Sequence, residues 1–264
     1  MKLLNIEKFK TSFTFLRGLT RESEHWGSFR KKFEKRYSPE NLFFCDLPGT
    51  GKLHSIPPVY NFSTLIDTVR LQILDKNLNN RNFQYRVLVG MSFGGMVACQ
   101  WLAKYSNDFD AIILINSSAS DLSTMNQRMN LSCVRYLLPA VLKLNMEMRE
   151  RRILQCVSNK KVDEEEVNRW IKIQKNSPVT IKTFLSQLFL ASTFSIKKIS
   201  FSIPTLVIYS SKDRLVSFQA SENIANYLNA EKSIHKWAGH DIALDDPDWL
   251  LNEILNFSEK NLVL

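Results

Sequence analysis

Short apolar runs alternate with amphipathic segments along most of the chain. The runs are rich in β-branched and aromatic residues, which predicts strands at residues 13–16, 41–45, 86–89, 111–115, 205–209 and 233–237. Between them, apolar residues recur at three- and four-residue steps, which predicts helices at residues 26–37, 63–78, 94–105 and 217–228. Asp246 followed by Pro247 is typical of a helix start and predicts a last helix through Phe257. We therefore expect an α/β fold, with a mostly parallel sheet and helices on both faces.

One long interval breaks this alternation. Residues 119–203 contain no convincing strand, but they repeat amphipathic helical patterns, as at 134–144 and 167–175. We expect a helical cap at 119–203, inserted into a core formed by 1–118 and 204–264. This cap is basic, because residues 121–198 hold 14 Lys and Arg against 7 Asp and Glu in a chain of net charge +9.

Length and composition fit one large domain with an inserted subdomain. The 264 residues are 44% hydrophobic and 23% charged, as in ordinary globular proteins. No segment resembles a signal peptide, and no apolar run approaches the roughly 18 residues of a membrane span. These features predict a cytoplasmic protein without a membrane span.

Cysteine spacing and net charge exclude several other classes. Cys45, Cys99, Cys133 and Cys156 are scattered without a CxxC motif, so we interpret them as reduced thiols rather than as metal ligands or disulfides. The positive charge favours anionic partners. Because no nucleic-acid-binding motif accompanies it, nucleic acid is not an expected partner.

The most specific chemical signal lies at residues 86–98. An apolar run ends in Gly90-Met91-Ser92-Phe93-Gly94 and continues into a helical pattern. This order predicts a strand, a sharp turn and a helix, with Ser92 presented at the turn as a nucleophile. The alternative interpretation is a glycine-rich bend with an idle serine.

A nucleophilic serine needs a base, and the base needs a carboxylate to orient it. His240 follows the last predicted strand in a loop that leads to the final helix. Asp213 lies just beyond the strand predicted at 205–209, and Asp121, beyond the strand at 111–115, is the alternative acid. Parallel sheets carry their chemistry at these carboxyl strand ends, so we expect Ser92, Asp213 and His240 to meet there.

Two further motifs are set aside. Gly49-Thr50-Gly51-Lys52-Leu53 differs from a phosphate loop, because Leu53 offers no hydroxyl for magnesium. The acidic run at 163–166 fits the start of a helix better than a metal cluster. We expect neither a metal nor a cofactor.

Together, these motifs resemble the α/β-hydrolase family over nearly the whole chain. Residues 46–51 look like the family's DxPGxG loop, and Arg17-Gly18-Leu19 is similar to a loop that usually reads His-Gly-x. The resemblance implies an oxyanion hole formed by the backbone N–H groups of Leu19 and Phe93. Two departures are the arginine at position 17 and a start that leaves the family's first strands shortened or absent.

The resemblance implies a serine hydrolase that cleaves a small-molecule ester or thioester through an acyl-enzyme. The chain is most similar to small bacterial hydrolases that cleave the methyl ester of pimeloyl-carrier-protein, which implies an acidic acyl carrier protein as a partner. Candidate substrate-binding residues are then Arg17, Trp26, Arg135, Arg149, Arg151 and Arg152. The alternative is a lyase of the menaquinone-pathway type that uses the same triad on a carboxylate-bearing substrate. A non-catalytic binding module is disfavoured by the intact serine, aspartate and histidine.

Overall fold

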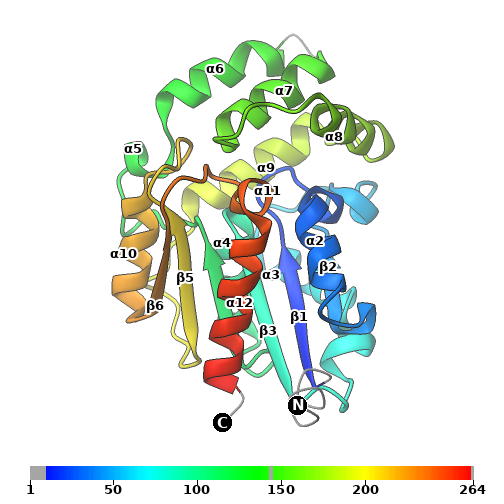
Figure 1. Ribbon diagram of the computed structural model, residues 1–264, viewed down its shortest axis with the longest axis vertical. Helices are drawn as coiled ribbons and strands as arrows, with labels where there is room; N and C mark the ends of the chain where they lie inside the picture. The colour runs from blue at the N-terminus through cyan, green and yellow to red at the C-terminus, as the bar shows by residue number, and fades with distance from the viewer. Residues whose placement is uncertain (1–9, 143–144, 263–264) are drawn as a thin grey trace.

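Six parallel strands form a single sheet in the computed structural model, which describes residues 10–142 and 145–262. Their order across the sheet is β2-β1-β3-β4-β5-β6 (Figure 1). The strands are β1 (Thr11–Leu16), β2 (Leu42–Cys45), β3 (Tyr85–Met91), β4 (Ala111–Ile115), β5 (Thr205–Ser210) and β6 (Glu231–His235). The predicted parallel sheet is confirmed. The predicted loss of earlier strands concerns residues 1–9, which lie outside the described residues.

Helices cover both faces of the sheet, and alternate strand residues point to opposite faces. Phe15, Val89 and Ile113 pack against one set of helices, whereas Leu88 and Leu114 pack against the other. The first set is α2 (Gly27–Glu34) and α12 (Pro247–Leu262), and the second is α3 (Phe62–Leu71), α4 (Phe93–Lys104) and α10 (Phe218–Leu228). Burial on both faces explains the continuous apolar runs of β4 and of residues 87–89 in β3.

Several predicted boundaries differ from the structure, and one helix was not predicted. The helix predicted at 63–78 ends at Leu71, and a π-helical turn, η4 (Leu74–Leu78), places the buried Asn77 side chain against the hydroxyls of Ser12 and Thr14. The last strand lies at 231–235 instead of 233–237, because an edge strand tolerates the polar residues that mask its apolar pattern. A separate short helix, α11 (Ile242–Asp245), precedes the last helix.

The segment between β4 and β5 is helical in its described residues. It contains α5 (Met125–Arg128), α6 (Leu131–Leu142), α7 (Met146–Val157), α8 (Glu164–Asn176) and α9 (Ile181–Thr193). In Figure 1, α6, α7 and α8 lie above the carboxyl ends of the strands. A buried ion pair of 2.7 Å between Arg21 and Glu150 joins α7 to the loop after β1. Residues 143 and 144 of the predicted helix at 134–144 lie outside the described residues.

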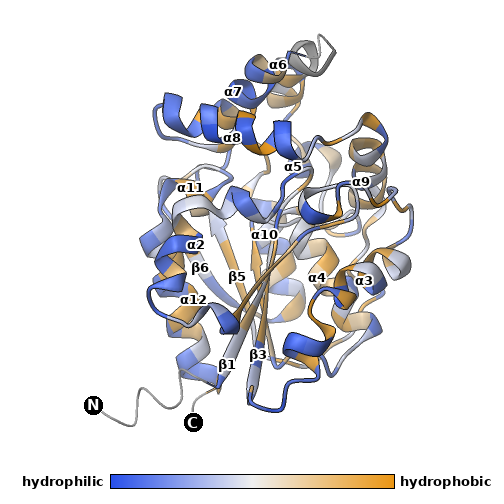
Figure 2. Ribbon diagram, turned by 90° about the vertical axis from the view of Figure 1, so that its right-hand side faces the viewer, coloured by the Kyte–Doolittle hydropathy of each residue, from blue (hydrophilic) through white to orange (hydrophobic). Residues whose placement is uncertain are grey.

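Hydrophobic residues gather in the strands and in the helices packed on them, whereas α7 and α8 are mainly hydrophilic (Figure 2). Of the helices in the described ranges, none combines the length and the apolarity needed to cross a lipid bilayer. The predicted site residues are expected between the carboxyl edge of the sheet and the helices above it.

Candidate active site

Ser92 occupies a strained turn between β3 and α4. Its backbone has φ 54° and ψ −118°, in the positive-φ range that non-glycine residues rarely adopt. The Ser92 N–H donates a 2.7 Å hydrogen bond to the carbonyl of Ile115 at the end of β4. A Cβ atom at position 94 would collide with the carbonyl oxygen of Leu16, so Gly94 lets α4 begin close to β1. The turn therefore presents Ser92 at the carboxyl edge of the sheet, near the point where strand order reverses.

His240 and Asp213 form a buried pair. The Nδ1–H of His240 donates to Oδ2 of Asp213 at 2.6 Å, and the two side chains are 6% and 1% exposed. Oδ1 of Asp213 accepts the backbone N–H groups of Leu215 and Val216 at 2.8 and 3.0 Å. These bonds fix the carboxylate, which in turn fixes the imidazole with Nε2 available as a proton acceptor.

The alternative acid, Asp121, has a different role. Its carboxylate accepts the Ser195 hydroxyl and the backbone N–H groups of Ile196 and Lys197. It makes no contact with His240 and instead holds the loop that follows α9. The geometry therefore favours Asp213 as the partner of His240.

Asn116, which was not among the predicted site residues, links the histidine loop to the sheet. Its Nδ2 donates to the His240 carbonyl at 2.7 Å, and its Oδ1 accepts the Ser210 N–H at 3.0 Å. Ile115 and Asn116, consecutive at the end of β4, thus hold the serine turn and the histidine loop at one edge. In the sequence, the role of Asn116 is indicated by a polar residue directly after the apolar run at 111–115.

The structure brings Ser92 and His240 to the same edge without a hydrogen bond between their side chains in the described residues. In hydrolases without substrate, the contact between nucleophile and base is often long and tightens when substrate binds. The shared attachment to β4 limits how far the two loops can separate.

The two predicted oxyanion-hole residues flank Ser92. Phe93 is the first residue of α4, so its N–H lies at the positive end of the helix dipole. A Cβ atom at Gly18 would lie 3.3 Å from the Ser92 Cβ, which places the Leu19 loop against the serine turn. Within residues 10–142 and 145–262, neither the Leu19 nor the Phe93 N–H donates a hydrogen bond to another group. Both can therefore serve a substrate oxygen.

Gln187 of α9 supports this loop and was also missed. Its Oε1 accepts the N–H of Thr20 at 2.7 Å, where Thr20 has a φ of 60°. Thr183, Ser186 and Gln187 are buried at helical spacing. That polar stripe within a helix was a signal for a supporting contact.

Arg17 is engaged by the protein itself. Its Nη2 and Nη1 lie 2.5 and 3.3 Å from the Asp241 carboxylate oxygens, and the guanidinium stacks 4.8 Å above the Trp26 ring. Arg17 is 2% exposed, and Trp26, at 1%, packs in the core. Both side chains are buried in contacts within the protein, which does not support the predicted substrate-binding role, and that role stays a prediction. Arg17 instead joins the Leu19 loop to the residue after His240.

We expect Arg17→Gln to lower the free energy of unfolding by about 3–5 kcal/mol, because it leaves the Asp241 carboxylate buried without its partner. Urea unfolding measures this loss. The control is Arg30→Gln, which breaks partly exposed ion pairs with Glu24 and Glu34 and should cost less than about 1 kcal/mol. Similar losses in the two variants would contradict a buried structural role for Arg17.

Three of the four candidate cap arginines also have partners within the chain. Arg149 donates hydrogen bonds to Glu150 and Gln174. Arg151 forms ion pairs with Glu147 and Glu164. Arg152 donates to the carbonyl of Tyr136 and stacks on the ring of that residue. Arg135 is exposed and forms no hydrogen bond or ion pair with another described residue. The paired arginines Arg149, Arg151 and Arg152 thus serve contacts among α6, α7 and α8.

The pKa of His240 sets the expected pH dependence. Burial by itself lowers this pKa, but the Asp213 carboxylate, through its charge and hydrogen bond, and the Asp241 carboxylate raise it above 6.5 overall. The imidazole must be neutral to accept the Ser92 proton. We therefore expect kcat/KM to fall as the pH decreases through a value above 6.5 in an ester-hydrolysis pH profile. An acid limb well below that value would show that His240 is not the base.

A strained serine after a central strand, beside a buried histidine–aspartate pair, defines the serine-hydrolase class of α/β proteins. The family described as serine aminopeptidase, S33 matches residues 29–246, and the chain belongs to this family of α/β-hydrolases. The human monoacylglycerol lipase ABHD6 is 22% identical over 261 residues, which cover 94% of this chain and 75% of that protein.

Solved esterases share the fold. The esterase RhEst1 from Rhodococcus sp. ECU1013 has a TM-score of 0.75 at 16% identity, covering 96% of this chain and 92% of that chain. The esterase EaEST from Exiguobacterium antarcticum has a TM-score of 0.75 at 14% identity, covering 94% and 92%.

Proposed function

We propose that this α/β-hydrolase cleaves carboxylic esters through a covalent acyl-enzyme. The observation that carries the proposal is the buried His240–Asp213 pair, held by the end of β4 at the same sheet edge as the strained Ser92. Such a pair converts a weak hydroxyl nucleophile into a reactive one.

In the proposed reaction, the Ser92 Oγ attacks the ester carbonyl carbon while Nε2 of His240 accepts its proton. The carbonyl oxygen gains negative charge and accepts the N–H groups of Leu19 and Phe93, each worth about 3 kcal/mol of transition-state stabilisation. The imidazolium, stabilised by Asp213, then protonates the leaving alcohol as the C–O bond breaks. Water, activated by the same imidazole, releases the acid and restores Ser92.

The proposed substrate is an ester with an apolar group, and α9 carries exposed apolar residues. Ile181, Leu185 and Phe189 follow one face of α9 at four-residue steps and are 61%, 52% and 50% exposed. The Phe189 ring lies 6.4 Å from that of Tyr60. Another face of this helix carries Gln187, which contacts the loop of the proposed oxyanion hole. The names of a related lipase and two esterases agree with this substrate class.

Two alternatives to a simple ester substrate are an acyl-carrier-protein substrate and a lyase reaction. An acyl-carrier-protein substrate would dock through cap cations. Among these, Arg135, Lys160 and Lys161 are exposed and form no ion pair with another described residue. The lyase alternative needs cations that bind substrate carboxylates, and Arg17 already binds Asp241. We therefore favour ester hydrolysis over the lyase reaction.

The test is turnover of p-nitrophenyl butyrate with mass spectrometry of the quenched enzyme. We expect p-nitrophenol release and an acyl adduct on the peptide that contains Ser92. A parallel reaction with a butyryl thioester of acyl carrier protein distinguishes the leaving groups by kcat/KM. Absence of ester turnover, of an acyl adduct and of labelling by a fluorophosphonate would contradict the proposed function.

A further inference from the structure

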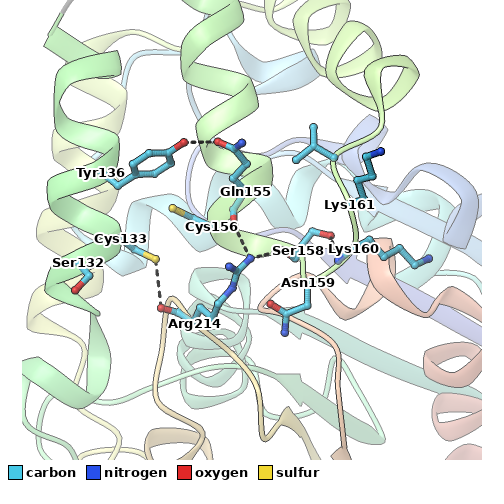
Figure 3. A pocket seen from close by; sticks show the side chains of 11 residues that line it. Ser132, Cys133, Tyr136, Gln155, Cys156, Ser158, Asn159, Lys160, Lys161 and Arg214 are labelled. Carbon is cyan, nitrogen blue, oxygen red and sulfur yellow. Dashed lines mark hydrogen bonds between the residues drawn. The ribbon is translucent and has the colours of Figure 1, made fainter.

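A pocket of about 690 Å³ lies between the cap helices α6 and α7 and the loop after β5, separate from the residues of the proposed reaction (Figure 3). Three cations line it, Lys160, Lys161 and Arg214, and none forms an ion pair with a described carboxylate. Arg214 instead donates to the carbonyls of Gln155 and Ser158. The pocket is therefore electropositive, and it adjoins the loop that carries the proposed catalytic acid.

Two cysteines from different helices meet in the wall of this pocket. Cys133 of α6 is half-buried, and Cys156 of α7 is 4% exposed. Both thiols line the same pocket. Burial, together with the nearby Cys133 thiol, raises the pKa of Cys156 to about 12. The Cys133 S–H also donates to the Arg214 carbonyl at 3.3 Å. Figure 3 shows both sulfur atoms on the facing sides of α6 and α7.

We propose that Cys133 and Cys156 are an oxidation site, which hydrogen peroxide converts into a disulfide between α6 and α7. Cys133 is the attacking thiol because it is the more exposed of the two and borders the cationic pocket. Partly exposed, electropositive surroundings are typical of cysteines that react with oxidants. Both cysteines are free thiols in the structure.

The proposed reaction balances with peroxide as the only oxidant. The Cys133 sulfur attacks one peroxide oxygen, the O–O bond breaks, and one water and a sulfenic acid form after proton transfer. The Cys156 sulfur then attacks the Cys133 sulfur, the S–S bond forms, the S–O bond breaks, and the hydroxyl leaves as water with the Cys156 proton. Two thiols are oxidised by two electrons in total, and one peroxide is reduced to two waters.

The site differs from the other two cysteines. Cys45 and Cys99 are 3% and 1% exposed in the core, and burial raises the pKa of each thiol. Neither makes a contact with another thiol among the described residues. Oxidation is therefore expected to be confined to the cap, where a disulfide would fix α6 to α7 and replace the Cys133 hydrogen bond to Arg214.

The experiment treats the reduced full-length protein with a few equivalents of hydrogen peroxide, then alkylates it with iodoacetamide after unfolding. We expect two of the four thiols to escape alkylation, a mass loss of two hydrogens, and a non-reduced peptide pair that joins Cys133 to Cys156. Dithiothreitol should restore four alkylated thiols. In Cys156→Ser, dimedone should trap a sulfenic acid on Cys133, whereas Cys133→Ser should react more slowly.

The other outcomes contradict the proposal. Alkylation of all four thiols after peroxide treatment would show that the pair is inert. A sulfenic acid that persists on Cys133 in the wild type, or a disulfide between two chains, would show that Cys156 does not reach Cys133. Because no step uses Ser92, failure here leaves the proposed ester hydrolysis unaffected.

Discussion

Ser92→Ala is expected to lower kcat for ester hydrolysis by about 10⁴-fold or more. Without the hydroxyl, no acyl-enzyme forms, and the remaining oxyanion donors act only on direct attack by water. The fold should persist, because the turn is held by the Ser92 backbone N–H and by close packing at Gly94. Turnover of p-nitrophenyl butyrate measures the loss, and thermal unfolding checks that the variant is folded.

Ser106→Ala is the matched control, since Ser106 is exposed and lies beyond the opposite end of α4 from the turn. It should retain wild-type turnover and label fully with a fluorophosphonate, whereas Ser92→Ala should not label. Labelling of Ser92→Ala at the wild-type rate would place the nucleophile at another residue.

The serine turn and the parallel sheet were predictable because both depend on short-range patterns. Residues 90–94 determine one local backbone path, and strands buried on both faces leave continuous apolar runs. The positions of Asp213 and His240 follow from the same logic, because the carboxyl ends of parallel strands share one edge. Their roles in catalysis remain predictions that the substitutions test.

Contacts between distant segments could not be predicted in the same way. Nothing near Arg17 in the sequence indicates that its partner is Asp241, 224 residues away. The partners of the α7 arginines could not be predicted either. Their charge suggested that they bind a ligand, but their neighbours in the fold are glutamates and a tyrosine. A charged side chain shows which chemistry is possible, but only the fold shows which partner it has.

The second large effect is expected for Asp213→Asn, which should lower kcat/KM by about 10⁴-fold. The amide oxygen can still accept the N–H groups of Leu215 and Val216, so the loop is retained. The amide nitrogen then faces Nδ1 of His240 and, as a donor, requires a lone pair there. The imidazole proton moves to Nε2, which can no longer accept the proton of Ser92.

Asp121→Asn separates this effect from a general loss of a buried carboxylate. The Asp121 carboxylate accepts two backbone N–H groups and the Ser195 hydroxyl. Its substitution should therefore lower the Tm, while kcat/KM stays within a few-fold of wild type. Asp213→Asn should show the reverse, with little change in Tm and a large loss of turnover. If Asp121→Asn lost as much activity as Asp213→Asn, or if Asp213→Asn kept turnover within tenfold, Asp213 would not be the carboxylate that orients the base. Both carboxylates accept hydrogen bonds from backbone N–H groups, but only that of Asp213 contacts an imidazole. The two substitutions therefore separate loss of this contact from loss of a buried carboxylate.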